Sequence, residues 1–148
     1  ETGLALMMGT SGAGAFCGAL LLTFLGNFKH KGWSVLGGAF AFSVFLIGFA
    51  LSTNLWGSLV FIFVMGFSIV SCVAVINMLL QQLVTDEMRG RVMSMFILSF
   101  VGAMPIGNLV AGAAAGRFGA PHTLATGGFI LTLFVAVVAL TNRGLREL

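Results

Sequence analysis

Five apolar stretches, each long enough to cross a lipid bilayer as a helix, make up most of this sequence. Short polar or charged segments separate them, and a helix needs about 20 residues to cross the hydrocarbon core. The alternation of apolar and polar residues that a membrane barrel needs is absent. The sequence therefore predicts an all-α, polytopic membrane protein, with one membrane domain over residues 1–148. The expected transmembrane helices span approximately residues 4–28, 33–51, 55–84, 92–116 and 122–141.

The composition supports a lipid environment. The chain is 59% hydrophobic and only 7% charged, with a mean hydropathy of +1.11, and a soluble domain of 148 residues could not bury that much apolar surface. The net charge of +3 is small and lies between the apolar stretches, so nucleic acid is not expected as a partner. Cys17 and Cys72 lie inside apolar stretches without CxxC or histidine spacing, so we predict no metal site and no cofactor.

Basic residues predict how the chain is oriented in the bilayer. They cluster at alternate boundaries of the apolar stretches, as Lys29 and Lys31, Arg89 and Arg91, and Arg143 and Arg146. The opposite side carries only Arg117. The positive-inside rule then predicts a cytoplasmic C-terminus and an external first residue. A chain that starts outside, without Met or a signal sequence, is expected to follow an odd number of further membrane spans.

The densest charged segment lies between the third and fourth apolar stretches. Asp86, Glu87, Arg89 and Arg91 fall within six positions, together with Gly90. Thr85 is expected to cap the fourth helix, and the two acids would lie in its first turn, where the helix dipole favours negative charge. The arginines would either form a conformational latch with acids elsewhere in the protein or hold headgroup phosphates. No nucleophile and base accompany these acids, so an enzyme is not expected.

Two sequence strings and a glycine-rich opening point to a family. QQLVTDEMRGRVMS (residues 81–94) and GAMPIGNLVAG (residues 102–112) resemble the C-terminal half of a major facilitator superfamily transporter, where an RGRV-type loop joins helices ten and eleven and a PxGxxxxG pattern follows. GTSGAGAFCGAL (residues 9–20) resembles helix eight. The strings are most similar to the bacterial efflux branch that includes siderophore exporters and macrolide efflux proteins.

This resemblance implies that the chain supplies helices eight to twelve of a twelve-helix transporter. The expected partners are then the missing N-terminal half, the lipid bilayer and a small-molecule substrate. The implied activity is export of an apolar or amphipathic molecule, such as a drug, macrolide or siderophore-like compound, by an antiporter in the bacterial cytoplasmic (inner) membrane. One departure stands out: the segment 27–32 lacks the acid that the family often carries between helices eight and nine.

Glycine and proline mark candidate packing and bending positions. Gly14 and Gly18, and likewise Gly112 and Gly116, are spaced for close helix–helix packing, with homodimerisation as the alternative. Pro105 removes a backbone hydrogen bond within the fourth apolar stretch, between Gly102 and Gly107. It predicts either a hinge of a gating helix or a static kink.

The third apolar stretch carries the most polar side chains. At 100° per residue, one face holds Ser68, Ser71, Cys72, Met78 and Gln82. Asn77 and Gln81 lie nearly opposite, and we predict that they contact substrate, followed by Asn108 in the fourth stretch. Hydrogen bonding between helices is the alternative for each. No Asp, Glu, Lys, Arg or His lies in the middle of a stretch, so a proton-coupling residue is expected outside this chain.

Two other functions fit parts of the sequence. A channel subunit would be expected to show filter-like backbone segments or a ring-forming charge, and neither is visible. A non-transporting scaffold or assembly subunit fits the composition but does not account for the RGRV and proline–glycine strings.

Overall fold

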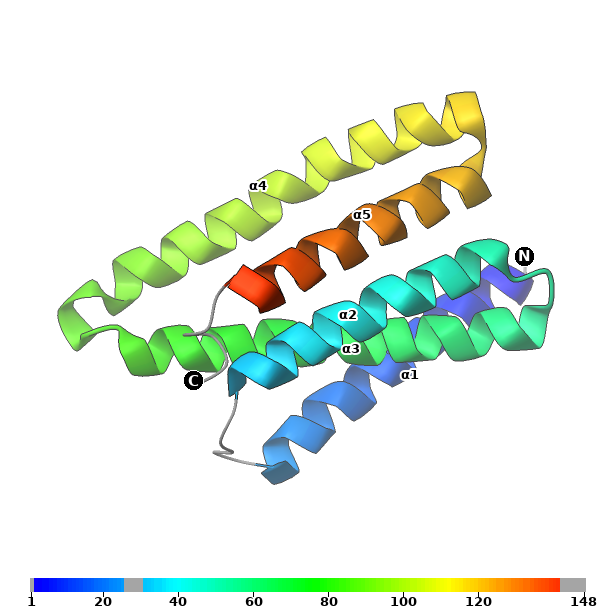
Figure 1. Ribbon diagram of the computed structural model, residues 1–148. Coiled ribbons are helices and arrows are strands. Elements are labelled where there is room, and N and C mark those ends of the chain that lie inside the picture. The colour runs from blue at the N-terminus through cyan, green and yellow to red at the C-terminus, as the bar shows by residue number, and fades with distance from the viewer. Residues whose placement is uncertain (1, 26–30, 142–148) are drawn as a thin grey trace.

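The computed structural model describes residues 2–25 and 31–141, which form five helices (Figure 1). All five helices are long and apolar enough to cross a membrane. The elements of the described residues are all helices, which confirms the predicted all-α class. Lys29, Arg143 and Arg146, three of the basic residues used to predict orientation, lie outside the described residues. The helices are α1 (Thr2–Leu25), α2 (Lys31–Leu51), α3 (Leu55–Leu83), α4 (Asp86–Phe118) and α5 (Ala120–Thr141).

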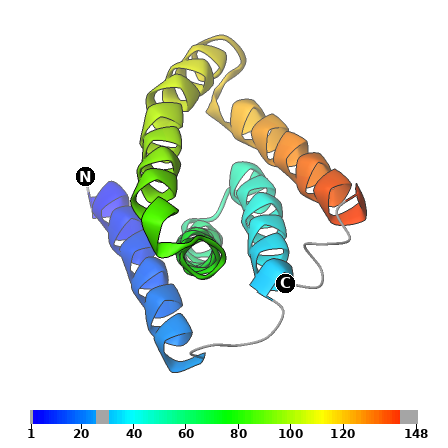
Figure 2. The ribbon, with the colours of Figure 1, turned by 90° about the vertical axis from the view of Figure 1, so that its left-hand side faces the viewer.

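Helix α3 lies at the centre of the packing. It contacts α1 on one side and α2 on another, α2 also packs against α5, and α4 packs mainly against α5 (Figures 1 and 2). Phe61 of α3 meets Phe45 of α2, with ring centroids 5.9 Å apart. Since lipid tails are as apolar as these side chains, close fit rather than exclusion of water must hold the helices together.

Glycines create the closest contacts between helices. A Cβ on Gly14 of α1 would collide with the carbonyl oxygen of Phe63 in α3, and a Cβ on Gly18 would lie 2.7 Å from the carbonyl oxygen of Phe67. On α5, a Cβ on Gly128 would lie 2.7 Å from Ile47 of α2. At these crossings a hydrogen atom in place of a methyl group lets the two backbones approach.

The turn between α3 and α4 consists of two residues, Val84 and Thr85, both in extended conformation. Helix α4 begins at Asp86, before the apolar stretch that starts near Val92, so the two acids lie in its first turn as the capping pattern predicted. Thr85 occupies the cap position, but its side chain makes no capping hydrogen bond. The charged segment is therefore helical, because a helix end in water or at headgroups tolerates charge as readily as a loop does.

The turn between α4 and α5 is shorter still. Residues 117–121 were expected to form a loop, yet α4 continues through Arg117 to Phe118, and only Gly119 separates it from α5. Gly119 adopts φ 84°, a conformation that residues with a Cβ rarely take. Pro121 lies in the first turn of α5, where proline is tolerated because its missing N–H would have no helical partner.

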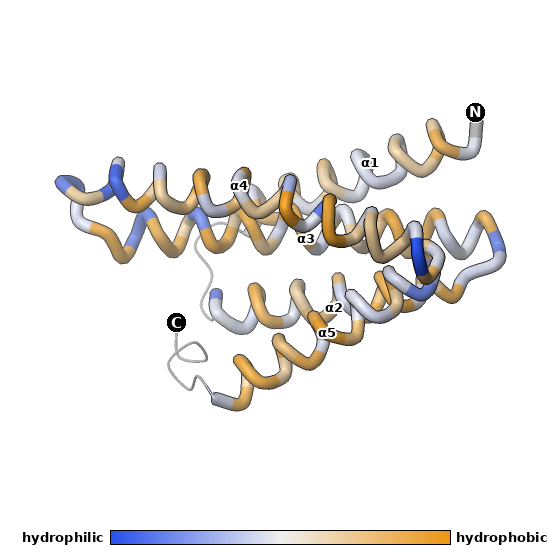
Figure 3. Tube along the Cα trace, turned by 90° about the horizontal axis from the view of Figure 1, so that it is seen from above, coloured by the Kyte–Doolittle hydropathy of each residue, from blue (hydrophilic) through white to orange (hydrophobic). Residues whose placement is uncertain are grey.

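Helix α4 differs from the other four in its exposure. Throughout its 33 residues no side chain is buried. Polar side chains concentrate toward the helix ends, and the most hydrophilic part of the tube includes the α3–α4 turn (Figure 3). Much of the apolar surface of α4 is thus left for lipid or for other protein to cover.

Candidate transport surface

The first polar face of α3 is covered by its neighbours. Ser68 is buried, and the Cys72 thiol donates to the carbonyl oxygen of Val35 in α2 at 3.4 Å. Ser71 lies against Gly18 of α1, and its buried hydroxyl has no hydrogen-bond partner in the described part of the chain. This face therefore serves the contacts of α3 with α1 and α2.

Gln82 is exposed but hydrogen-bonds to a neighbouring helix. Its side-chain oxygen accepts a hydrogen bond from Nζ of Lys31 in α2 at 2.5 Å, and Lys31 is only 4% exposed. The sequence did not predict this pair, since Lys31 was assigned only to membrane orientation. The bond joins the first turn of α2 to the last turn of α3.

Within the described residues, the side chains of Asn77 and Gln81 form no hydrogen bond to α1 or α2. The Asn77 amide nitrogen donates to the carbonyl oxygen of Val73, one turn earlier in the same helix, at 3.1 Å. Asn77 is half-buried, whereas Gln81 is exposed. An amide bonded to its own helix keeps its oxygen as an acceptor for a further partner.

Asn108 does not join these two amides. Its side chain is exposed on α4, and α4 runs antiparallel to α3 (Figure 1). At 1.5 Å per residue, Asn77 lies about 9 Å from the end of α3, and Asn108 about 33 Å from the start of α4. The two positions differ by about 24 Å along the helices, so one small molecule could not contact both in this arrangement.

The charged turn is organised around Arg89. Its Nη2 lies 2.8 Å from Oδ1 of Asp86 and donates to the backbone oxygen of Gln81 at 3.4 Å. The backbone N–H groups of Met88 and Arg89 both bond to the carbonyl oxygen of Thr85. Glu87, Gly90 and Arg91 are exposed.

The other glycine and proline candidates lie in open parts of α4. The helix continues through Pro105 without interruption. A Cβ on Gly102, Gly107, Gly112 or Gly116 would meet nothing within 4 Å in the described chain. In contrast to Gly14 and Gly18, the pair Gly112 and Gly116 therefore has no helix packed against it here.

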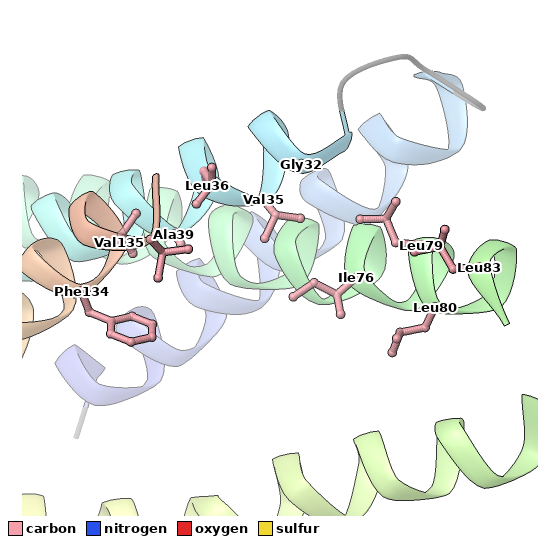
Figure 4. Close-up of a pocket in the computed structure, with 11 residues that line it drawn as sticks. Gly32, Val35, Leu36, Ala39, Ile76, Leu79, Leu80, Leu83, Phe134 and Val135 are labelled. Carbon is pink, nitrogen blue, oxygen red and sulfur yellow. The ribbon is translucent and has the colours of Figure 1, made fainter. Parts of the chain in front are cut away.

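An apolar cavity lies between α2, α3 and α5. It measures about 350 Å³, and Figure 4 shows its side chains converging from the three helices. The lining residues are Gly32, Val35, Leu36, Ala39, Ile76, Leu79, Leu80, Leu83, Phe134, Val135 and Val138. No charged or hydrogen-bonding side chain is among them.

Two wider clefts border α4. One, of about 510 Å³, lies between α3 and α4 and is lined by Ile69, Phe96, Ser99, Phe100, Ala103 and Met104. The other, of about 580 Å³, lies at the α4–α5 turn and is lined by Ala114, Phe118, His122, Thr123 and Thr126. Both clefts combine aromatic surface with hydroxyl groups, and neither is lined by an acid or an arginine.

A buried hydroxyl pair between α2 and α5 was also missed from the sequence. Thr132 Oγ1 lies 2.9 Å from Oγ of Ser43, which is fully buried and bonds to the carbonyl oxygen of Phe40. Small polar residues inside apolar stretches were the available signal. Over the described residues, no three His, Cys, Asp or Glu side chains are grouped closely enough to bind a metal ion.

Comparison with known proteins supplies the family. The profile of the transmembrane secretion effector family, within the major facilitator superfamily, matches residues 2–148. No curated protein and no solved structure matches the chain. Because the match covers nearly the whole length and the five helices are long enough to span a membrane, this chain is a multi-pass membrane protein that belongs to the transmembrane secretion effector family of major facilitator superfamily transporters.

Proposed function

We propose that this chain forms helices eight to twelve of an exporter that moves a small apolar or amphipathic molecule by alternating access. The family match supports a transport role. The exposure of α4 is the observation that carries the rest, because none of its 33 residues is buried and its apolar surface is free to pack against further protein as well as lipid. In this proposal the absent N-terminal half and helix seven provide that protein.

The contact pattern supports the same assignment. Helices α2 and α5 pack together, α4 packs against α5, and α1 is joined to this pair through α3. On one side α3 bridges α1 and α2. On the other side, within the described chain, no helix bridges α4 and α5 in the same way. A further helix there would complete two similar halves, as expected for a transporter built from repeats.

The chemistry of the clefts supports an uncharged or weakly polar cargo. The apolar space between α2, α3 and α5 and the clefts beside α4 are lined by aliphatic, aromatic and hydroxyl side chains. Such walls suit the apolar body of a drug, macrolide or siderophore-like molecule, whereas a small ion would need charged or carbonyl ligands. We assign direct contacts to Asn77 and Gln81, which the packing of α1 and α2 leaves accessible.

Orientation and location complete the proposal. The described basic residues Lys31, Arg89 and Arg91 lie at the α3–α4 end of the bundle, and Arg117 lies at the opposite end of α4. The positive-inside rule would then place the α3–α4 turn and the C-terminus in the cytoplasm of a bacterium, with the helices in its inner membrane. Coupling to protons by antiport would use a titratable residue in another part of the protein.

Binding measurements on four variants of the intact protein test the site. Asn77→Ala and Gln81→Ala should each weaken binding of a fluorescent amphipathic drug, because losing a buried amide contact costs about 1–3 kcal/mol. The controls Ser68→Ala and Gln82→Ala should lower Tm and leave affinity unchanged, since both residues face neighbouring helices. Greater sensitivity of the Ser68 and Gln82 variants would reverse the proposed facing of α3.

Transport itself is tested in energised membrane vesicles. Inverted vesicles that carry the intact protein should accumulate the drug against its gradient, and an uncoupler should abolish the accumulation. Passive equilibration that the uncoupler does not affect would indicate a channel. No protein-dependent flux of several amphipathic drugs would favour a scaffold subunit.

A further inference from the structure

The last turn of α3 accepts cationic side chains from two different helices. Lys31 of α2 donates to the side chain of Gln82 at 2.5 Å, and Arg89 of α4 donates to the backbone oxygen of Gln81 at 3.4 Å. We propose that Lys31 and Arg89 together form a clasp on the end of α3, which fixes how α2 and α4 are tilted against it. This clasp is independent of the transport function proposed above.

Helix physics explains why cations gather at this end. The last four carbonyl groups of a helix lack partners within the helix, and they form the negative end of its dipole. Helix α3 ends at Leu83, so the Gln81 carbonyl is one of these groups. The Val84 N–H donates to the carbonyl oxygen of Leu80, and the Arg89 side chain of the following helix donates to the carbonyl oxygen of Gln81. A cation from α4 thus stabilises the end of α3.

Asp86 holds Arg89 in the position that reaches back to α3. The two side chains are three residues apart in α4 and form the 2.8 Å ion pair. The Asp86 side chain is 87% exposed and the Arg89 side chain 48%, and an exposed ion pair contributes little stability by itself. Its consequence is geometric, because it restricts the rotamers of Arg89 to those that point toward α3.

Helix α4 packs mainly against α5, and its few contacts with α3 leave the angle between α3 and α4 dependent on this restriction at the turn. No residue of α4 is buried, and a cleft of about 510 Å³, lined by Ile69, Phe96 and Phe100 among others, lies between α3 and α4. The connection itself is only two extended residues. Leu109 lies about 36 Å along α4 from the turn, so a 5° change in tilt would move it by about 3 Å. The clasp and the α4–α5 contact would then together set the width of the α3–α4 cleft.

Spin-label distances in the intact protein test the α4 half of the clasp. Labels at Val60 and Leu109 suit this measurement, since each lies 24 residues from the turn, on opposite sides of it, and both side chains are exposed. In a background with Cys17 and Cys72 replaced by alanine, Arg89→Gln should broaden the distance distribution and shift it by about 3 Å. Asp86→Asn should cause a smaller shift of the same sign.

Arg91→Gln is the matched control, because it removes the same charge two residues away without touching the described contacts. It should leave the distribution unchanged. The proposal is overturned if Arg89→Gln has no effect, if Arg91→Gln has an equal effect, or if Asp86→Asn has none while Arg89→Gln shifts the distance. The last result would place the partner of Arg89 elsewhere in the protein.

Hydrogen exchange tests the α2 half. Lys31→Met should speed amide exchange in the last turn of α3 about five- to tenfold, as expected when a charge-assisted hydrogen bond is lost. Gln82→Glu keeps the acceptor and adds an opposite charge, so it should slow exchange there. Unchanged exchange around Gly14 shows that the variants remain folded. Faster exchange in Gln82→Glu, or unchanged exchange in Lys31→Met, would overturn this half of the clasp.

Discussion

Gly14 lies where α1 crosses α3, and the space that a side chain would fill there is occupied by the backbone of Phe63. Gly112 and Gly116 have the same spacing in sequence as Gly14 and Gly18, but in the structure they face open space. The spacing of small residues thus identifies surfaces suited to close packing. It does not identify which surface is used within this chain, because that depends on which helix is adjacent.

A methyl group at position 14 should separate α1 from α3. Gly14→Ala is expected to destabilise the protein by about 1–3 kcal/mol, since the collision involves backbone, which cannot move aside as a side chain can. Thermal unfolding in detergent measures the effect. Gly12→Ala is the control, because a Cβ on Gly12 meets nothing within 4 Å. Equal melting temperatures for the two variants would contradict the described crossing.

At the scale of helices, the number and type of elements could be predicted from hydropathy, but most of their ends could not. Hydropathy predicts five helices because each must satisfy its backbone hydrogen bonds within lipid. It predicts ends poorly because helices continue into water: α4 begins six residues before its apolar stretch does at Val92, and the capping pattern at Thr85, not hydropathy, predicted this start. The pairs Lys31–Gln82 and Ser43–Thr132 join residues 51 and 89 positions apart, and only the helix arrangement brings them together.

The Ser43–Thr132 pair should measurably stabilise the contact between α2 and α5. Thr132→Val keeps the shape of the side chain but removes the hydroxyl, and a lost hydrogen bond between membrane helices costs about 0.6–1.7 kcal/mol. Unfolding of the variant in detergent should show this loss. In Thr126→Val, the lost hydroxyl bonds only within α5, so the change should be smaller. A larger loss at Thr126 would argue against the α2–α5 contact.

The hinge prediction for Pro105 also concerns a whole helix. If α4 bends there during transport, Pro105→Ala in the intact protein should slow transport and leave expression and affinity nearly unchanged, because the restored backbone bond stiffens the helix. Initial rates of drug uptake into vesicles would show the change. Pro121→Ala, in the first turn of α5, is the matched control. An unaltered rate for Pro105→Ala would mean that the proline serves a static role.

Across the whole molecule, two helices are much longer than the hydrocarbon core of a bilayer is thick, and two others match that thickness. Helices α3 and α4 have 29 and 33 residues, or about 44 and 50 Å, whereas α2 and α5 have 21 and 22 residues, or about 32 and 33 Å. The hydrocarbon core is about 30 Å thick. The turn end of α3 and α4 should therefore extend beyond the core, which accounts for its charge. Asn77 and Gln81 then lie closer to the headgroups than to the bilayer centre.

Cysteine labelling tests this placement and the orientation together. Gly90→Cys, at the α3–α4 turn, should react with an impermeant maleimide only from the cytoplasmic side, in inverted vesicles. Thr53→Cys, between α2 and α3 at the opposite end, should react only in intact cells with a permeabilised outer envelope. Both residues are exposed. Labelling of position 90 from outside would reverse the orientation inferred from the basic residues.

The single residue between α4 and α5 also bears on how the protein is made. Gly119 bonds back to Ala115 through its N–H at 2.9 Å, and its carbonyl accepts from Thr123 at 3.2 Å, so the two helix ends are tied to the same residue. Because no further residue separates the two helices, we expect the insertion machinery to release α4 and α5 into the bilayer as one hairpin. The mainly apolar α5 would then carry the more polar start of α4 into place during synthesis.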